Sequence, residues 1–97
     1  MAGFIQLVEF ETDDIDRVEN AIRKFRDDHP DVMKFTFSRV GEDRDKPGTY
    51  ISIVEFPSYE TAMEQSNHPA LSEFVQSSEA GMMANRRFRN LDVRSEI

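Results

Sequence analysis

Short runs of β-favouring residues alternate along the chain with helical patterns. Phe4 to Phe10 is rich in aromatic and branched residues and is followed by the polar run Glu11 to Asp14, which predicts a first strand. Apolar residues then recur at spacings of three, four and three, at Ile15, Val18, Ile22 and Phe25. This spacing predicts an amphipathic helix that begins after a cap among Thr12 to Asp14 and ends before Pro30.

A clear two-residue alternation comes next. From Val32 to Val40 the large apolar residues fall on one face, at Met33, Phe35 and Phe37, which predicts a second strand. The charged segment Gly41 to Gly48 has turn residues at both ends and is expected to be a loop. Tyr50 to Phe56 is β-rich again, so we expect a third strand that forms a hairpin with the second.

The second helical region is interrupted. Ser58 is a suitable N-cap for a helix that reaches about Gln65. The segment Asn67 to Pro69 is expected to break or kink this helix, because proline disfavours helical geometry in the residue before it. A further helical turn then places three apolar side chains inward, those of Leu71, Phe74 and Val75.

The carboxy-terminal part completes the pattern. Glu79 to Asn85 is expected to be a loop around Gly81, and Arg87 to Val93 a last short strand. The resulting order β-α-β-β-α-β is the ferredoxin-like motif, an α+β fold with two helices on one face of an antiparallel four-stranded sheet. We therefore expect one domain over residues 1–97.

Both faces of the predicted sheet are apolar. In the first strand Ile5 and Leu7 point one way, and the other face carries Phe4, Val8 and Phe10. Two helices cover only one face, so we expect a second copy to cover the other, giving a homodimer and a dimeric α+β barrel. The alternative is that the aromatic residues lie at sheet ends or under loops.

Polar residues interrupt the face that we expect the partner to cover. Gln6, Tyr50 and Ser52 share it with apolar neighbours. Apolar walls with a few polar groups are typical of a small-molecule pocket, and equally of an ordinary dimer interface. Both interpretations stay open, and these three residues are candidates for substrate binding.

Composition narrows the function classes. The chain has 97 residues, a formal net charge of −7 and no cysteine. An acidic chain is a poor match for nucleic acid, and the absence of cysteine excludes disulfides, thiolate metal sites and cysteine nucleophiles. The strand pattern begins at Phe4, and the longest apolar runs are only two or three residues. We therefore expect neither a targeting segment nor a membrane span, and a cytoplasmic location.

Histidines and tyrosines are the candidates for chemistry. His68 lies at the break in the second helix beside Asn67, where a ring that titrates near neutrality could act as an acid or base. The alternative is that both residues only cap helical segments. Tyr59 and Tyr50 are the only phenols; either could bind a phenolic or quinone substrate, or simply fill core or interface space.

Cofactor and metal motifs are missing from the sequence. His29 and His68 have no partner at the spacing of a histidine metal site, and His29 lies in a charged helix end where it could act as a C-terminal cation. The four glycines are scattered and form no phosphate loop. We expect no metal and no cofactor.

The segment from Tyr50 to Phe74 resembles the third strand and second helix of the antibiotic-biosynthesis-monooxygenase-like (ABM-like) superfamily. Shared features are a strand, a Pro-Ser step, a Glu- and Ala-containing helix, a His-Pro break and a following aromatic residue. The resemblance implies a dimeric α+β barrel with a cavity for a small ligand. Some members are cofactor-independent monooxygenases that oxidise anthrone-like phenols with O2, and others degrade haem.

The chain departs from both active types. Haem-degrading members use a tryptophan, an asparagine on the first strand and a histidine ligand; this chain has no tryptophan, Gln6 stands about where the asparagine would be, and Val75 lies near the ligand position. Anthrone oxidases use Trp, Asn and Tyr, of which only a tyrosine and Asn67 have counterparts.

Two classes of function therefore stay open. One is a cofactor-free monooxygenase or isomerase acting on a small aromatic or polyketide-like compound, with His68 as acid/base and with Tyr59, Asn67 and Gln6 orienting the substrate. The other is a non-catalytic dimeric ligand-binding or stress-associated protein.

Overall fold

The computed structural model describes residues 3–97, without the side chains of residues 78 and 79. The expectation that the amino terminus carries no targeting segment concerns Met1 and Ala2, which lie outside the described residues. Strands and helices follow in the order β1 (Phe4–Glu11), α1 (Ile15–Asp28), β2 (Phe37–Glu42), β3 (Thr49–Phe56), α2 (Tyr59–Ser66), α3 (Pro69–Val75), α4 (Ser78–Gly81) and β4 (Ala84–Asp92).

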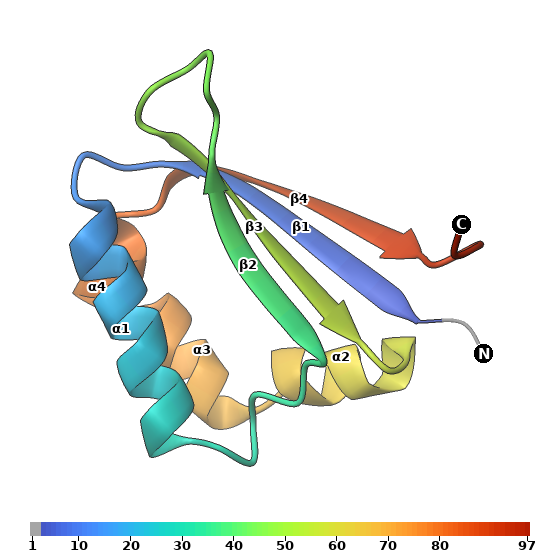
Figure 1. Cartoon of the computed structure of the whole chain (residues 1–97). Helices are drawn as coiled ribbons and strands as arrows, with labels where there is room; N and C mark the ends of the chain where they lie inside the picture. The colour runs from blue at the N-terminus through green and yellow to red at the C-terminus, as the bar shows by residue number, and fades with distance from the viewer. Residues whose placement is uncertain (1–2) are drawn as a thin grey trace.

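The strands form one antiparallel sheet in the order β2-β3-β1-β4. All the helices lie on the same side of this sheet, with α1 beside α3 and α4, and α2 crossing beneath one end of the strands (Figure 1). The predicted ferredoxin-like α+β fold is confirmed, with the second helical region divided at Asn67 and His68 as the sequence indicated.

Helix α1 matches its prediction closely. Asp14 is the N-cap, and its side chain accepts a hydrogen bond from the backbone N–H of Arg17 at 3.2 Å. At the other end the backbone N–H of His29 donates to the carbonyl of Phe25 at 2.9 Å. Val18 and Phe25 of the predicted stripe are buried, so the apolar face packs inward.

The core under the sheet is aromatic at one end. Phe4 of β1 and Phe56 of β3 are buried against Ala62 of α2. Phe35, Val54 and Met63 pack around this cluster. Because Phe4 and Phe56 are direct register partners on neighbouring strands, α2 is held beneath both central strands at once.

The second strand is shorter and later than predicted. β2 covers Phe37–Glu42, so Gly41 belongs to the strand and not to the following loop. The backbone bends at Thr36, which places Phe35 against the buried core while Phe37 lies opposite Glu55 on the other face of the sheet. The prediction that Phe35 and Phe37 share one face of the sheet was therefore wrong, because two-residue alternation holds only along an unbroken strand.

The structure differs in two ways from the loop that was predicted at residues 79–85. Ser77 caps a short helix, α4, by accepting the N–H of Ala80 at 3.3 Å, and Ala80 is buried. β4 then begins at Ala84 and not at Arg87, through an irregularity in its pairing with β1 between Glu9 and Glu11. Asn85 has φ of 54°, a left-handed conformation that asparagine tolerates, and this accommodates the extra residue of the bulge.

The assignment of the two sheet faces was wrong. Gln6, Tyr50 and Ser52 alternate in phase with the buried Phe4, Phe10 and Phe56, so they lie on the face that the helices cover. The uncovered face instead carries Ile5, Leu7, Ile51 and Ile53. Alternation shows which residues share a face, but it does not show which face the helices choose when both are apolar.

Within the described residues, no helix has the length and apolar character needed to cross a membrane.

Candidate functional site

A pocket of about 350 Å³ lies between the helix-covered face of the sheet and the α2–α3 region. We call it the sheet–helix pocket. Its lining comes from β1, α2, α3 and β4 and consists of Gln6, Ser66, Leu71, Ser72, Val75, Gln76 and Phe88. Every one of these side chains is uncharged, although the chain as a whole has a net charge of −7. Apolar walls with a few amides and hydroxyls suit an uncharged organic ligand.

Gln6 is held in place by a neighbour across the strands. Gln6 and Asn90 are register partners on β1 and β4, and Gln6 Nε2 donates a hydrogen bond to Asn90 Oδ1 at 3.2 Å. This bond uses one amide hydrogen of Gln6 and leaves its carbonyl oxygen to accept from a ligand. Gln6 is therefore oriented at the pocket, and its binding role stays a prediction.

Two of the apolar side chains that line the pocket, Phe88 and Val75, are exposed to solvent. Phe88 has 57% of its surface accessible and Val75 46%, on β4 and α3 respectively. Both line the pocket, so an exposed apolar surface faces Gln6 across a small volume. A flat apolar ligand would cover this surface and gain the free energy of its burial.

The break between α2 and α3 uses Asn67 and His68 as caps. Asn67 is the C-cap of α2, and its backbone N–H donates to the carbonyl of Met63 at 2.9 Å. His68 is the N-cap of α3, where its Nδ1 accepts the N–H of Ala70 at 3.1 Å. Both side chains are exposed. His68 follows Ser66 closely in sequence, so it stands near the pocket without lining it.

The two tyrosines lie at opposite ends of β1. Tyr59 packs edge-on against Phe4 with ring centroids 5.4 Å apart, and Tyr50 stacks on Phe10 at 5.8 Å. Phe4 and Phe10 are six residues apart on one strand, roughly 20 Å at about 3.3 Å per residue. The structure therefore does not bring both phenols to one small ligand.

Partial burial is the main reason that the pKa of the Tyr50 phenol is raised above its ordinary value, and the nearby Glu42 carboxylate adds to the effect. Tyr50 is thus a protonated hydrogen-bond donor at neutral pH. Ser52 lies between the two ends, on the same face, opposite Val8 of β1 and Val40 of β2. Of the six predicted site residues, only Gln6 lines the sheet–helix pocket.

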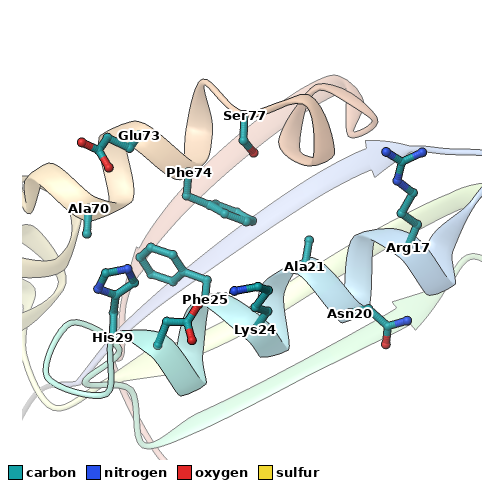
Figure 2. Close-up of a pocket in the computed structure, with 11 residues that line it drawn as sticks. Arg17, Asn20, Ala21, Lys24, Phe25, His29, Ala70, Glu73, Phe74 and Ser77 are labelled. Atoms are coloured by element: carbon teal, nitrogen blue, oxygen red, sulfur yellow. Dashed lines mark hydrogen bonds and ion pairs between the residues drawn. The ribbon is translucent and has the colours of Figure 1, made fainter.

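A second, larger groove of about 530 Å³ runs between α1 and α3. Figure 2 shows Phe25 and Phe74 facing each other across it, with ring centroids 5.1 Å apart. Its charged side chains are partly engaged: Lys24 Nζ lies 2.7 Å from Asp28 Oδ2. The hydrogen bond between them raises the pKa of Lys24 and lowers that of Asp28. None of the six predicted site residues lines this groove.

Sequence reasoning missed the partners that complete the sheet–helix pocket. Phe88 and Asn90 reach Gln6 only through the register of β1 with β4, strands at opposite ends of the chain. Ser66 and Ser72, which also line the pocket, were not among the predicted site residues. Within the described part of the chain, no three His, Cys, Asp or Glu side chains come together in a way that could hold a metal ion.

Comparison with known proteins identifies the fold of the chain. No protein-family model matches the chain, and no curated protein matches it significantly. Solved structures do match over nearly the whole length. SnoaB, a cofactor-independent oxygenase from Streptomyces nogalater, superimposes with a TM-score of 0.76 at 10% identity, over 99% of this chain and 96% of that chain.

Two further structures agree with this. A provisionally named antibiotic biosynthesis monooxygenase from Bordetella bronchiseptica gives a TM-score of 0.74 at 8% identity, over 100% of both chains. A protein from Shewanella oneidensis gives 0.72 at 10% identity, over 94% of this chain and 90% of that chain. The chain thus has the fold of ABM-like proteins, as its sequence led us to expect.

Proposed function

We propose that this chain is a cofactor-independent monooxygenase that acts on a small aromatic or polyketide-like compound bound in the sheet–helix pocket. The observation that carries the proposal is the pocket itself: uncharged, walled by Phe88 and Val75, and provided with an oriented amide at Gln6. The shared fold with SnoaB, a cofactor-independent oxygenase, supports it.

The proposed reaction needs only O2 and an activated substrate. A methylene group next to a phenol ring or ketone loses a proton and becomes a carbanion, which gives one electron to O2. Recombination of the two radicals forms a hydroperoxide, and loss of water leaves a carbonyl. One CH2 and one O2 thus become one C=O and one H2O, and no external reductant is consumed.

The residues divide these tasks. The Gln6 carbonyl orients a hydroxyl of the substrate, and the apolar walls formed by Phe88 and Val75 pack against its ring. His68 serves as the acid/base through Nε2, because Nδ1 is occupied by the N–H of Ala70. Asn67 lies beside it at the helix break. Tyr50 and Ser52 lie on the face of β3 that the helices cover, and Tyr59 lies on α2. Their roles toward the substrate stay predictions.

A second candidate function has its own support. None of the seven side chains that line the pocket carries an ionisable acid or base, which fits a binding protein that holds an uncharged ligand without turnover. On this alternative, His68 and Asn67 act only as caps.

Oxygen consumption separates the two functions. Purified protein treated with a chelator is mixed with 1,8-dihydroxyanthrone in air-saturated buffer, and O2 uptake is followed together with the ketone product. The monooxygenase proposal expects protein-dependent uptake of one O2 per carbonyl formed, and lower uptake in Gln6→Leu. Binding of the anthrone without protein-dependent O2 uptake would support the binding-protein alternative.

We also propose that the functional unit is a homodimer joined through the uncovered sheet face. Ile5, Leu7, Ile51 and Ile53 form an apolar centre there, beyond the reach of the helices. A second copy of the chain, packed through the same face, would remove these apolar side chains from water.

A further inference from the structure

β2 leaves one side of its backbone unpaired. The strand stands at the end of the order β2-β3-β1-β4, so its outer edge pairs with no other strand of the described chain (Figure 1). The N–H of Asp43 donates to the carbonyl of Thr49 at 2.8 Å, in line with the register of β2 with β3. Backbone groups point alternately to the two sides of a strand, so the odd-numbered residues of β2 bond to β3. The N–H and C=O groups of Ser38 and Val40 therefore point outward.

A cavity of about 420 Å³ opens along this edge. Ser38, Arg39 and Val40 all line it, although Arg39 lies opposite Ile53 on the uncovered face and its guanidinium stands over the Phe37 ring at 4.9 Å. Three consecutive residues of an alternating strand line one cavity where that cavity follows the backbone edge. We call it the edge groove, and its other lining residues are Glu19, Ile22, Arg23 and Arg26 of α1 with Met33 and Phe35.

The edge groove has an apolar floor beside the unpaired backbone. Ile22, Met33 and Phe35 are half-buried, and Phe35 packs against the core cluster under the sheet. The floor therefore lies on the side of the sheet that the helices cover, where the side chains of Ser38 and Val40 also lie. An apolar side chain placed there would gain the free energy of its burial.

The charge of the edge groove is opposite to that of the whole chain. Three arginines and one glutamate line it, whereas the chain has 19 acidic and 12 basic residues. Arg23 and Arg26 lie one turn apart on α1, on the wall that faces β2. Arg26 donates its Nε to Asp27 at 3.2 Å, and its two Nη groups remain to bind another carboxylate. The groove thus complements an acidic group.

We propose that the edge groove binds an extended peptide segment of another protein, which adds an antiparallel strand to β2. The peptide backbone exchanges hydrogen bonds with the outward groups of Ser38 and Val40. Residues directly opposite each other on paired strands share a face, so two peptide side chains, two positions apart, point toward α1. One is apolar and covers Ile22, and the other is acidic and binds Arg23 and Arg26. This site is separate from the sheet–helix pocket and does not depend on the reaction proposed there.

The two edges of the sheet differ in their suitability for such pairing. β4 carries three arginines and an irregularity in its pairing with β1, features that discourage the addition of a strand. Between Phe37 and Gly41, β2 has one charged side chain, Arg39, and no proline. The open edge of β2 is therefore the one that accepts a partner strand.

A short blocked peptide tests the backbone contact. The probe is acetyl-Ser-Ile-Thr-Glu-Thr-Ser-amide, in which Ile and Glu stand two positions apart on one face. Titration into 15N-labelled protein, followed by NMR, should shift the amide signals of Ser38 and Val40 and slow their hydrogen exchange. N-methylation of the peptide at Ile and Glu removes the two N–H groups that face β2 and should weaken binding by about 5- to 150-fold. N-methylation at the two Thr residues, whose N–H groups point away, is the matched control and should leave the affinity nearly unchanged.

A second comparison tests the charge. The double variant Arg23→Gln with Arg26→Gln should bind the Glu peptide about 2- to 30-fold more weakly, the range expected for two exposed ion pairs. Its affinity for the same peptide with Gln in place of Glu should equal that of wild type. Arg44→Gln removes an exposed arginine outside the groove and should change neither affinity.

Three results would overturn the inference. One is a Glu peptide that leaves the amides of Ser38 and Val40 unshifted. Another is equal loss of affinity from the two N-methylated pairs, because the peptide would then be held by its side chains alone, as a small organic acid is. The third is slow exchange of the Ser38 and Val40 amides before any peptide is added, which would show that a second copy of the chain already covers the edge.

Discussion

The two ring nitrogens of His68 have different tasks available to them. Nδ1 accepts the N–H of Ala70 at 3.1 Å, so in the neutral ring the hydrogen resides on Nε2. Only Nε2 is left to exchange a proton with a ligand. The same side chain thus combines an observed capping role with a proposed catalytic one, and a substitution that removes both would not separate them.

Asparagine separates the two roles of His68. Asn is among the best N-cap residues, whereas Gln is not favoured there, and neither titrates. With His68 as the acid/base, both His68→Asn and His68→Gln should lower the rate of anthrone oxidation by about 10²–10⁴-fold. Only His68→Gln should also lose stability, by about 1 kcal/mol. The test is to measure the oxidation rate and the urea midpoint of wild type, His68→Asn and His68→Gln. An unchanged rate in His68→Asn would show that His68 acts only as the N-cap of α3.

At the scale of elements, the pocket depends on helices that are too short to be stable by themselves. α2 covers Tyr59–Ser66 and α3 covers Pro69–Val75, whereas isolated helices need roughly 12–15 residues to be even marginal in water. Their ends must therefore be fixed by caps and by packing on the sheet. Ser58 does this for α2, because its Oγ accepts the N–H of Thr61 at 3.2 Å.

The cap of α2 gives a direct test of this dependence. Ser58→Ala removes the acceptor and should lower the free energy of unfolding by about 1 kcal/mol, whereas Ser58→Asp should retain most of it. Urea unfolding measures both, with Ser95→Ala as a control at an exposed serine beyond β4. A Ser58→Ala protein as stable as the control would show that packing alone fixes the start of the helix.

Local rules predicted the elements that local interactions determine. The stripe and caps of α1, and the division of the second helical region at His68, depend on residues within a few positions of each other. α4 was missed because its buried Ala80 depends on packing with distant elements, which no short window contains. The start of β2 was misplaced because the bend at Thr36 is set by pairing with Glu55.

The candidate site could be predicted only in part, for a related reason. Gln6 was identified from its place among apolar neighbours, and it does line the pocket. Its partner Asn90 comes from β4, and the register that joins them spans almost the whole chain.

On the scale of the whole molecule, the uncovered sheet face has a charge pattern as well as an apolar centre. Arg39, Ile53, Leu7 and Arg89 form one row across the four strands. Glu9 and Glu55 lie on the central strands of the same face. No ion pair joins these carboxylates to those arginines within the described chain. A face with unpaired charges of both signs around an apolar centre can complement a second copy of itself.

The dimer can be tested at the middle of that face. A standard interface buries about 800 Å² per partner, a modest part of the 6947 Å² that one chain exposes. Sedimentation at micromolar concentration should give twice the 11.3 kDa mass of one chain. Leu7→Lys replaces an apolar side chain at the middle of the face with a third cation in the row of Arg39 and Arg89, and it should give a folded monomer, because association would have to strip the new charge of its water. Asn20→Lys adds the same charge on exposed α1 and should remain dimeric. Wild type sedimenting only at 11.3 kDa would refute the homodimer.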